Sequence, residues 1–271
     1  MTDRICHIDD ITDSRVALYT EYNEPQLFHY NEPDSGLFIA ETPMVIERAM
    51  ACGAKPLSFF VESGALENQE VKRILDMAGT VPVFEAQLQV INRITGFNLT
   101  RGMLAAFERP ALPGLRDLAG SAEKIAVLED VVNPTNVGAI FRSAAALGID
   151  CILLTAGCTD PFYRRSARVS MGTVFMIPWT YIPKETDIIS LLHDDHFTVI
   201  SMALTDDAVA LTDPVLKENP RTAVIFGSEG DGISKKTLEK SDHVAVIPMQ
   251  NGVDSLNVAA ASAVTFWELC R

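Results

Sequence analysis

The segment 130–142 carries a first group of residues that could do chemistry, namely Asn136, Gly138 and Arg142. Gly138 and Arg142 are four residues apart and therefore share one face of a predicted helix. Because Gly138 has no side chain, another backbone can approach beside the Arg142 guanidinium. A fixed planar cation of this kind suits a phosphate or a developing oxyanion. A capped helix with a solvent-exposed arginine explains this segment, taken alone, equally well.

A second group lies in the segment 226–234, where Gly227, Gly230 and Gly232 fall close together. Glycines permit positive φ and a close approach of the backbone to a ligand. The segment is not a GxGxxG motif and lacks the lysine of a phosphate-binding loop, which argues against a nucleotide-phosphate site. Glu229 would repel phosphates and better suits ribose hydroxyls or a cationic ligand. The alternative is an ordinary turn between a strand and a helix.

A third group follows the last predicted strand, where the chain passes through a glycine turn into a helix predicted over 255–270. Asp254 or Ser255 is the predicted N-cap of this helix. From Leu256 onward the helix is apolar on nearly every face, which predicts deep burial or a subunit interface. Asn257, near its start, needs either a hydrogen bond within the helix start or a ligand.

The elements that must position these groups alternate between strand and helix. Strands are predicted at 36–40, 57–61, 81–84, 124–129, 151–155, 197–201, 222–226 and 243–247. Helices are predicted after Thr42 and at 67–77, 137–147, 185–193, 234–240 and 255–270, with Asn136 as the N-cap of the helix over 137–147. This alternation predicts α/β architecture.

Two prolines and two glycines in the stretch 108–121 predict a linker between two domains. The linker separates a smaller N-terminal α/β domain over 1–107 from a second α/β domain over 122–271.

The chain of 271 residues carries a net charge of −14, and both halves are acidic. A nucleic-acid binder usually presents a basic surface, so binding of RNA or DNA requires a local basic patch. Arg164, Arg165 and Arg168 form such a cluster in the sequence. A solvated loop face also explains these three arginines.

Other features of the composition exclude several classes of protein. No apolar run approaches the ~18 residues that span a bilayer, so we expect no membrane segment. Five scattered cysteines and a polar N-terminus predict a reducing, cytoplasmic location. His, Cys and Asp residues show no metal-ligand spacing, so we expect no metal.

Taken together, the three groups resemble the signature motifs of the SpoU (TrmH) family of SPOUT RNA methyltransferases. The matching positions are Asn136-x-Gly138-x-x-x-Arg142, Phe226-Gly227-Ser228-Glu229-Gly230-x-Gly232 and Ile247-Pro248-Met249 followed by Ser255-Leu256-Asn257-Val258. They occur in the family's order, and each follows the expected kind of strand.

The sequence departs from the family pattern at three places. Ser228 stands where the family often has Asn, and Ala259 where it often has Ser. Asn251 stands where the family often has Gly, with Gly252 one place later. These changes weaken the assignment of a substrate more than the assignment of the class.

The resemblance implies a C-terminal SPOUT-type α/β domain with a trefoil knot that binds S-adenosylmethionine, and a homodimer. It implies an enzyme that transfers a methyl group to a ribose 2′-hydroxyl of rRNA or tRNA. The N-terminal segment is similar to the small RNA substrate-binding domain of many members. By position, the implied cofactor-binding residues are Thr155, Gly227, Glu229, Gly230, Ile247, Met249, Leu256 and Asn257. The implied catalytic residues are Arg142, Asn136, Glu229, Ser255 and Asn257, and Arg142 joins Arg164, Arg165 and Arg168 as an RNA-binding residue.

Since a guanidinium keeps its proton at neutral pH, we expect Arg142 to hold the adjacent phosphate and stabilise the forming alkoxide rather than act as a base. Two alternatives to the enzyme stay open. One is a catalytically silent RNA-binding homologue, against which the intact Asn136, Arg142 and Asn257 argue. The other is a nucleotide-dependent enzyme of another class, against which the missing GxGxxG and phosphate-binding loop argue.

Overall fold

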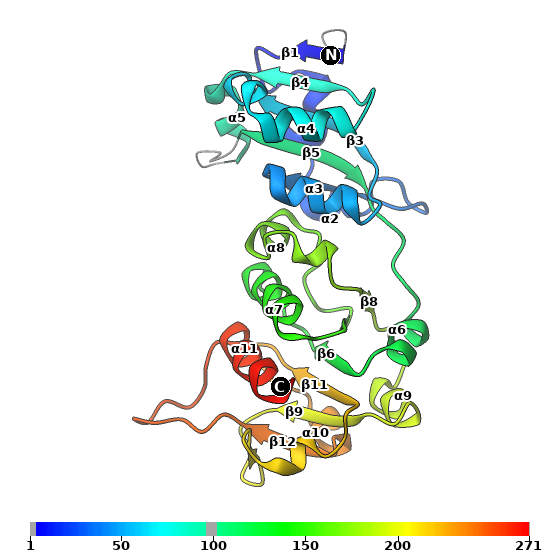
Figure 1. Ribbon diagram of the computed structural model, residues 1–271, viewed down its shortest axis with the longest axis vertical. Coiled ribbons are helices and arrows are strands. Elements are labelled where there is room, and N and C mark those ends of the chain that lie inside the picture. Colours follow the sequence, from blue (N-terminus) through cyan, green and yellow to red (C-terminus); the bar gives the residue numbers. More distant parts are fainter. Residues whose placement is uncertain (1–3, 96–101, 271) are drawn as a thin grey trace. The chain divides into compact units, whose positions relative to one another are not determined.

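Figure 1 shows the computed structural model of the chain, which describes residues 4–95 and 102–270. The predicted N-terminal domain over 1–107 therefore includes two stretches, 1–3 and 96–101, that lie outside the described residues. The chain divides into two compact units. Unit 1 comprises Met1–Ala111 and Phe162–Phe175, and unit 2 comprises Leu112–Pro161 and Met176–Arg271.

Unit 1 is built on a five-stranded mixed sheet in the order β1-β4-β3-β5-β2, in which β5 runs antiparallel to both of its neighbours. Its strands are β1 (Ile5–His7), β2 (Leu37–Glu41), β3 (Pro56–Glu62), β4 (Val83–Ala86) and β5 (Met103–Glu108). Its α-helices are α1 (Ala17–Thr20), α2 (Glu24–Phe28), α3 (Pro43–Ala51), α4 (Gln69–Met77), α5 (Leu88–Thr95) and α8 (Arg164–Val169). Its 3-10 helices are η2 (Ser14–Val16), η3 (Ser63–Glu67) and η4 (Thr173–Phe175).

An aromatic cluster in the core of unit 1 joins segments far apart in the sequence. Phe38 of β2 stacks on Phe107 of β5 with ring centroids 5.1 Å apart. Phe162 and Phe175, which flank α8, lie 5.2 and 5.4 Å from the Phe38 ring, and all four side chains are buried. The segment around α8 is therefore part of the unit 1 core, and a linear boundary near residue 107 leaves this segment out.

Unit 2 is built on a seven-stranded sheet in which every paired strand is parallel, in the order β10-β12-β9-β11-β6-β7-β8. Its strands are β6 (Lys124–Leu128), β7 (Cys151–Leu154), β8 (Trp179–Tyr181), β9 (Thr198–Met202), β10 (Val209–Ala210), β11 (Thr222–Phe226) and β12 (His243–Val246). Its helices are α6 (Leu115–Ser121), α7 (Pro134–Leu147), α9 (Ile188–Asp194), α10 (Lys235–Lys240), α11 (Val258–Leu269) and the 3-10 helix η5 (Pro214–Lys217). The predicted α/β fold class is thus confirmed.

Helix starts in unit 2 differ from the sequence prediction. Asn133 is the N-cap of α7, where Pro134 takes the first helical position, so Asn136 lies inside the helix and the predicted cap was wrong. Asn257 is the N-cap of α11 and its side chain accepts the Ala259 N–H at 3.0 Å. The predicted caps Asp254 and Ser255 lie before this point. Helix α6 also occupies half of the stretch that we predicted as a linker.

The strand order of unit 2 creates a place for a ligand. From β6 the chain first builds the sheet outward through β7 and β8, then crosses to the other side to add β9, with β11 between β9 and β6. In open parallel sheets, ligands bind beyond the carboxyl ends of strands at such a change of direction. Figure 1 shows α11 lying against the sheet beside α7, after a long segment that projects from the end of β12.

In the described part of the chain, no helix is long and apolar enough to cross a membrane.

Candidate active site

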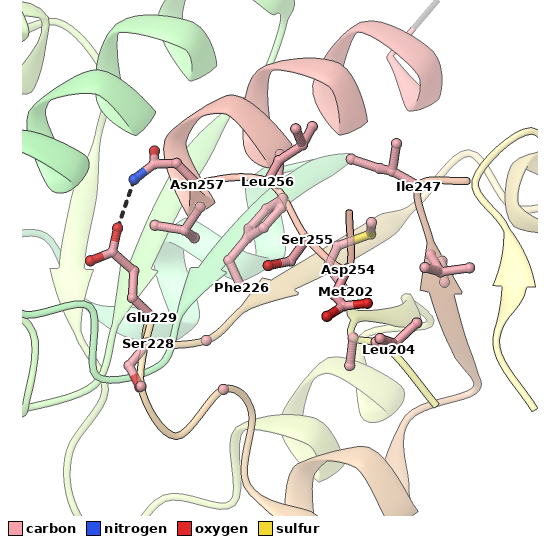
Figure 2. Close-up of a pocket in the computed structure, with 18 of the residues that line it drawn as sticks. Met202, Leu204, Phe226, Ser228, Glu229, Ile247, Asp254, Ser255, Leu256 and Asn257 are labelled. Atoms are coloured by element: carbon pink, nitrogen blue, oxygen red, sulfur yellow. Dashed lines mark hydrogen bonds between the residues drawn. The ribbon is translucent and has the colours of Figure 1, made fainter. Parts of the chain in front are cut away.

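A cavity of about 560 Å³ opens at the carboxyl ends of β9, β11 and β12 (Figure 2). Its lining comprises residues 202–204, 226–232, 245–247, 249, 254–258 and 261. The second and third groups identified in the sequence therefore form two of its walls. The volume lies within the range of about 300–1,000 Å³ that is typical of small-molecule sites.

The glycine loop between β11 and α10, residues 227–233, folds back on itself. The backbones of Ser228 and Gly232 exchange two hydrogen bonds, each 3.2 Å long. A Cβ atom on Gly227 would lie 2.2 Å from the carbonyl carbon of Gly232, so only glycine fits there. Gly232 itself has a φ of +68°, a conformation that favours glycine. These constraints give the loop the tight shape that presents Glu229 to the cavity.

Three polar side chains from the three sequence groups meet beside the cavity. Asn136 of α7 and Asn257 at the start of α11 donate from Nδ2 to the same Glu229 oxygen, Oε1, at 2.5 and 2.6 Å. Asn257 Nδ2 also lies 3.2 Å from Asn136 Oδ1, and Asn136 is buried. Figure 2 shows Glu229 and Asn257 pointing toward each other. The second oxygen of Glu229, Oε2, accepts no hydrogen bond from the described residues, so it can serve a ligand.

The charge of the cavity lining selects for a particular kind of ligand. Its ionisable residues are all acidic, namely Glu229, Asp231 and Asp254, and no Lys or Arg is among the described lining residues. Phe226 and Leu256 contribute apolar surface. This combination favours a ligand with a cationic group and an apolar ring system, and it disfavours the phosphates of a nucleotide cofactor.

Most residues predicted to bind cofactor line this cavity, namely Gly227, Glu229, Gly230, Ile247, Met249, Leu256 and Asn257, together with Ser255. Thr155 is not among the lining residues. Its hydroxyl donates to Asp130 Oδ1 at 2.6 Å and accepts the Asp130 N–H at 2.9 Å. Asp130 has a positive φ of 53°, so Thr155 fixes an unusual turn after β6.

Arg142 is also separate from the cavity lining. It is exposed on α7, six residues after Asn136, which places it about 120° away around the helix axis. Within this chain the structure therefore brings together Asn136, Glu229 and Asn257, and it leaves Arg142 at the surface.

The arginines of α8 lie in unit 1. Arg164 Nη2 lies 3.7 Å and Arg168 Nη1 3.5 Å from a carboxylate oxygen of Glu41, a side chain only 4% exposed. A buried carboxylate requires such compensation. We predicted that Arg164, Arg165 and Arg168 bind RNA. Two of them, Arg164 and Arg168, also balance the charge of the buried Glu41 carboxylate. The RNA-binding role of these three residues stays a prediction.

The end of β9 is the part of the cavity that sequence reasoning missed. Met202, Ala203 and Leu204 line it, and Leu204 is 67% exposed. These residues carry neither a glycine signature nor a charged group. The predicted strand at 197–201 was the one sequence feature that could have pointed to these residues, since the ends of neighbouring parallel strands share one edge of the sheet.

Among residues 4–95 and 102–270, no group of three or more His, Cys, Asp or Glu side chains is placed to hold a metal ion.

Comparison with known proteins agrees with the motifs. Residues 123–267 match the model of the SpoU rRNA methylase family. The chain is 37% identical to an uncharacterized tRNA/rRNA methyltransferase of Mycobacterium bovis over 87% of this chain and 81% of that protein. It is 25% identical to the 23S rRNA (guanosine-2′-O-)-methyltransferase RlmB of Escherichia coli, over 78% and 90% of the two chains. The solved AdoMet-bound rRNA methyltransferase from Sinorhizobium meliloti superposes with a TM-score of 0.82 and 25% identity, covering 98% and 97% of the two chains. This chain therefore belongs to the SpoU rRNA methylase family.

Proposed function

We propose that the protein is an RNA ribose 2′-O-methyltransferase that uses S-adenosylmethionine and acts on rRNA or tRNA. The observation that carries this proposal is the acidic cavity at the end of the parallel sheet, bordered by the hydrogen-bonded cluster of Asn136, Glu229 and Asn257. The name of the Escherichia coli relative RlmB supports both the 2′-oxygen as acceptor and rRNA as substrate.

The lining residues fit S-adenosylmethionine. Phe226 and Leu256 offer apolar surface to the adenine, and the carboxylates of the lining suit the cationic sulfonium and ammonium groups. The cofactor supplies an activated methyl group, so the protein needs only to position the acceptor hydroxyl and stabilise the charge that develops on it. Glu229, held through Oε1 by two amides, keeps Oε2 for hydrogen bonding to the ligands.

Arg142 fits a role toward RNA rather than toward the cofactor. It is exposed and lies outside the cavity lining. A guanidinium binds phosphate through a planar pair of donors and stabilises a forming alkoxide without losing its own proton. We therefore assign Arg142 to the phosphate next to the acceptor ribose.

A homodimer is part of this proposal. Helix α11 is rich in apolar residues. Two of its large apolar side chains, Val264 and Trp267, are nevertheless 42% and 50% exposed. Large exposed apolar side chains on one helix are typical of an interface. A second copy of this chain is the partner that the family resemblance implies.

Two measurements test the proposed function. Calorimetric titration with S-adenosylmethionine, NAD and ATP should show binding of the first alone. Incubation with total RNA from a strain lacking the gene, followed by mapping of ribose methylation, should show a new 2′-O-methyl group at one nucleotide. Binding of the cofactor without methylation of any RNA would favour the silent homologue, and binding of NAD or ATP instead would contradict the proposal.

A further inference from the structure

Glu129, the residue that directly follows β6, touches both ends of the glycine loop 227–233. Strands β6 and β11 end together, because Leu128 pairs with Phe226. The backbone N–H of Glu129 then donates to the carbonyl oxygen of Phe226 at 2.8 Å. This bond fixes the point at which the loop begins.

The side chain of Glu129 fixes the point at which the loop ends. Its Oε1 accepts the backbone N–H of Ser234 at 2.8 Å, and its Oε2 accepts the hydroxyl of Thr237 at 2.7 Å. Ser234 is the N-cap of α10, and Thr237 occupies the third position of that helix. The carboxylate therefore ties the start of α10 to the end of β6.

These contacts complete a helix cap across two elements. In a capping box, the N-cap side chain accepts the N–H of the third helical residue, whose own side chain accepts the N–H of the N-cap. Ser234 Oγ accepts the Thr237 N–H at 3.3 Å, but threonine has no carboxylate to complete the pair. Glu129, which follows β6, supplies the missing acceptor.

We propose that Glu129 is the positioning residue that holds the glycine loop in its ligand-binding shape, a role that rests on the proposed function. Between the two anchored ends stand Gly227, Gly230 and Gly232, which lose more backbone entropy on ordering than other residues do. Fixing both ends of this loop therefore lowers the entropy cost of ordering it more than it would for a turn without glycines. The loop carries Glu229 and forms one wall of the cavity, whereas Glu129 is not among the lining residues.

Glu129→Ala and Glu129→Gln test this role through two readouts, affinity for S-adenosylhomocysteine and amide hydrogen exchange of residues 227–233. Loss of hydrogen bonds to a charged group should weaken affinity about 10- to 100-fold in the alanine variant. Glutamine keeps an acceptor for the Ser234 N–H, and its neutral hydrogen bonds are about half as strong, so a loss of about three- to tenfold is expected. Exchange in the loop should accelerate in the same order.

Asp187→Ala is the matched control. Asp187 is also a helix N-capping carboxylate of unit 2, and it pairs with Lys240 at the far end of α10. It lies outside the cavity lining, so its loss should change neither the affinity nor the exchange of the loop, even where the melting temperature falls. If Glu129→Ala does not fold, Thr237→Val offers a milder test. It removes the hydroxyl that donates to Glu129 Oε2 and accepts from Ser234 Oγ, leaves the bond from the Ser234 N–H to Oε1 in place, and should weaken affinity in the same direction.

The outcomes separate the two proposals. Wild-type protein that binds no S-adenosylmethionine or S-adenosylhomocysteine contradicts the proposed function, and loop exchange then decides the role of Glu129 by itself. Wild-type protein that binds them, together with a Glu129→Ala variant of unchanged affinity and unchanged loop exchange, overturns the role of Glu129. An equal loss of affinity in Asp187→Ala would reduce that role to general stability.

Discussion

At the scale of single residues, Gly227 and Gly230 belong to the same loop and differ in their surroundings. A Cβ atom at Gly227 would meet backbone atoms of Gly232 and Ile233 at 2.2 and 2.5 Å, whereas a Cβ atom at Gly230 has nothing within 4 Å. Backbone cannot move aside as a flexible side chain can. The two glycines therefore form a natural matched pair of variants.

We expect Gly227→Ala to displace the loop, destabilise the protein by about 1–3 kcal/mol and weaken cofactor affinity at least about tenfold. Gly230→Ala should leave the stability nearly unchanged, because a Cβ atom there meets no other atom of the protein within 4 Å. Thermal unfolding of both variants and calorimetric titration of Gly227→Ala check this. An equal loss of stability at both positions would contradict the steric role of Gly227.

Arg142 supports a second prediction at this scale. Arg142→Ala should leave cofactor affinity unchanged and slow single-turnover methylation about 10²- to 10³-fold, the cost of one preorganised charge at a developing oxyanion. Arg142→Lys should recover little of this rate, because an ammonium cannot reproduce the planar fork. The assay uses saturating RNA and cofactor, and near wild-type turnover by the alanine variant would remove Arg142 from the chemistry.

At the scale of elements, one buried hydroxyl attaches α1 to the sheet of unit 1. Tyr19 donates to the carbonyl oxygen of Ser58 in β3 at 2.8 Å and accepts the N–H of Ala106 in β5 at 3.1 Å. Burial raises the pKa of the Tyr19 hydroxyl well above its usual value. The neutral hydroxyl is therefore the form that the folded state requires.

Tyr19→Phe should destabilise the protein by about 1–3 kcal/mol, because the Ala106 N–H loses its partner. The raised pKa also predicts a pH dependence. The stabilising contribution of Tyr19 is complete below the unfolded pKa of about 10 and declines as the pH rises above it. Urea unfolding at neutral and alkaline pH checks both effects. If Tyr19→Phe loses stability at alkaline pH as steeply as the wild type does, a group other than Tyr19 causes the pH dependence.

At the scale of the whole molecule, the chain returns to unit 1 after entering unit 2. Phe162, buried in the aromatic cluster with Phe38, belongs to this returning segment. Phe162→Ala should destabilise unit 1 by about 3–5 kcal/mol, although the residue lies far from the N-terminal domain in sequence. Hydrogen exchange of the full-length protein checks this. Accelerated exchange of the β2 and β5 amides is expected, and unchanged exchange there would contradict the shared core.

The homodimer supports a further prediction at this scale. Light scattering at micromolar concentration should give twice the mass of the 29.6 kDa chain. Trp267→Glu should shift the equilibrium toward the monomer, since a charge buried in an apolar interface is costly. Arg165→Glu, which changes charge in unit 1, serves as the control. A wild-type monomer mass would rule the dimer out.

The family, the α/β class and the segments that form the site could all be predicted from local sequence patterns. Apolar strand runs ending in glycine-rich loops are local signals, and Gly227 and Gly232 are required by backbone geometry that the sequence pattern already indicates. The predicted strands of unit 2 correspond to β6, β7, β9, β11 and β12 within a residue or so at each end. The knot and the roles of the individual site residues stay predictions.

Which distant groups meet could not be predicted in this way, because it depends on how the strands and helices pack in the folded chain. Glu229 bonds to Asn136, 93 residues away, and to Asn257, 28 residues away. Glu129 bonds to Ser234 and Thr237, 105 and 108 residues away. Parallel strand pairing sets such contacts, because every neighbour in the sheet of unit 2 is brought in by a crossover rather than by a local turn. The same non-local packing places the end of β9 at the cavity and the α8 segment in the core of unit 1. The sequence predicts the strand that becomes β9, but the neighbours of this strand in the sheet are set by the fold.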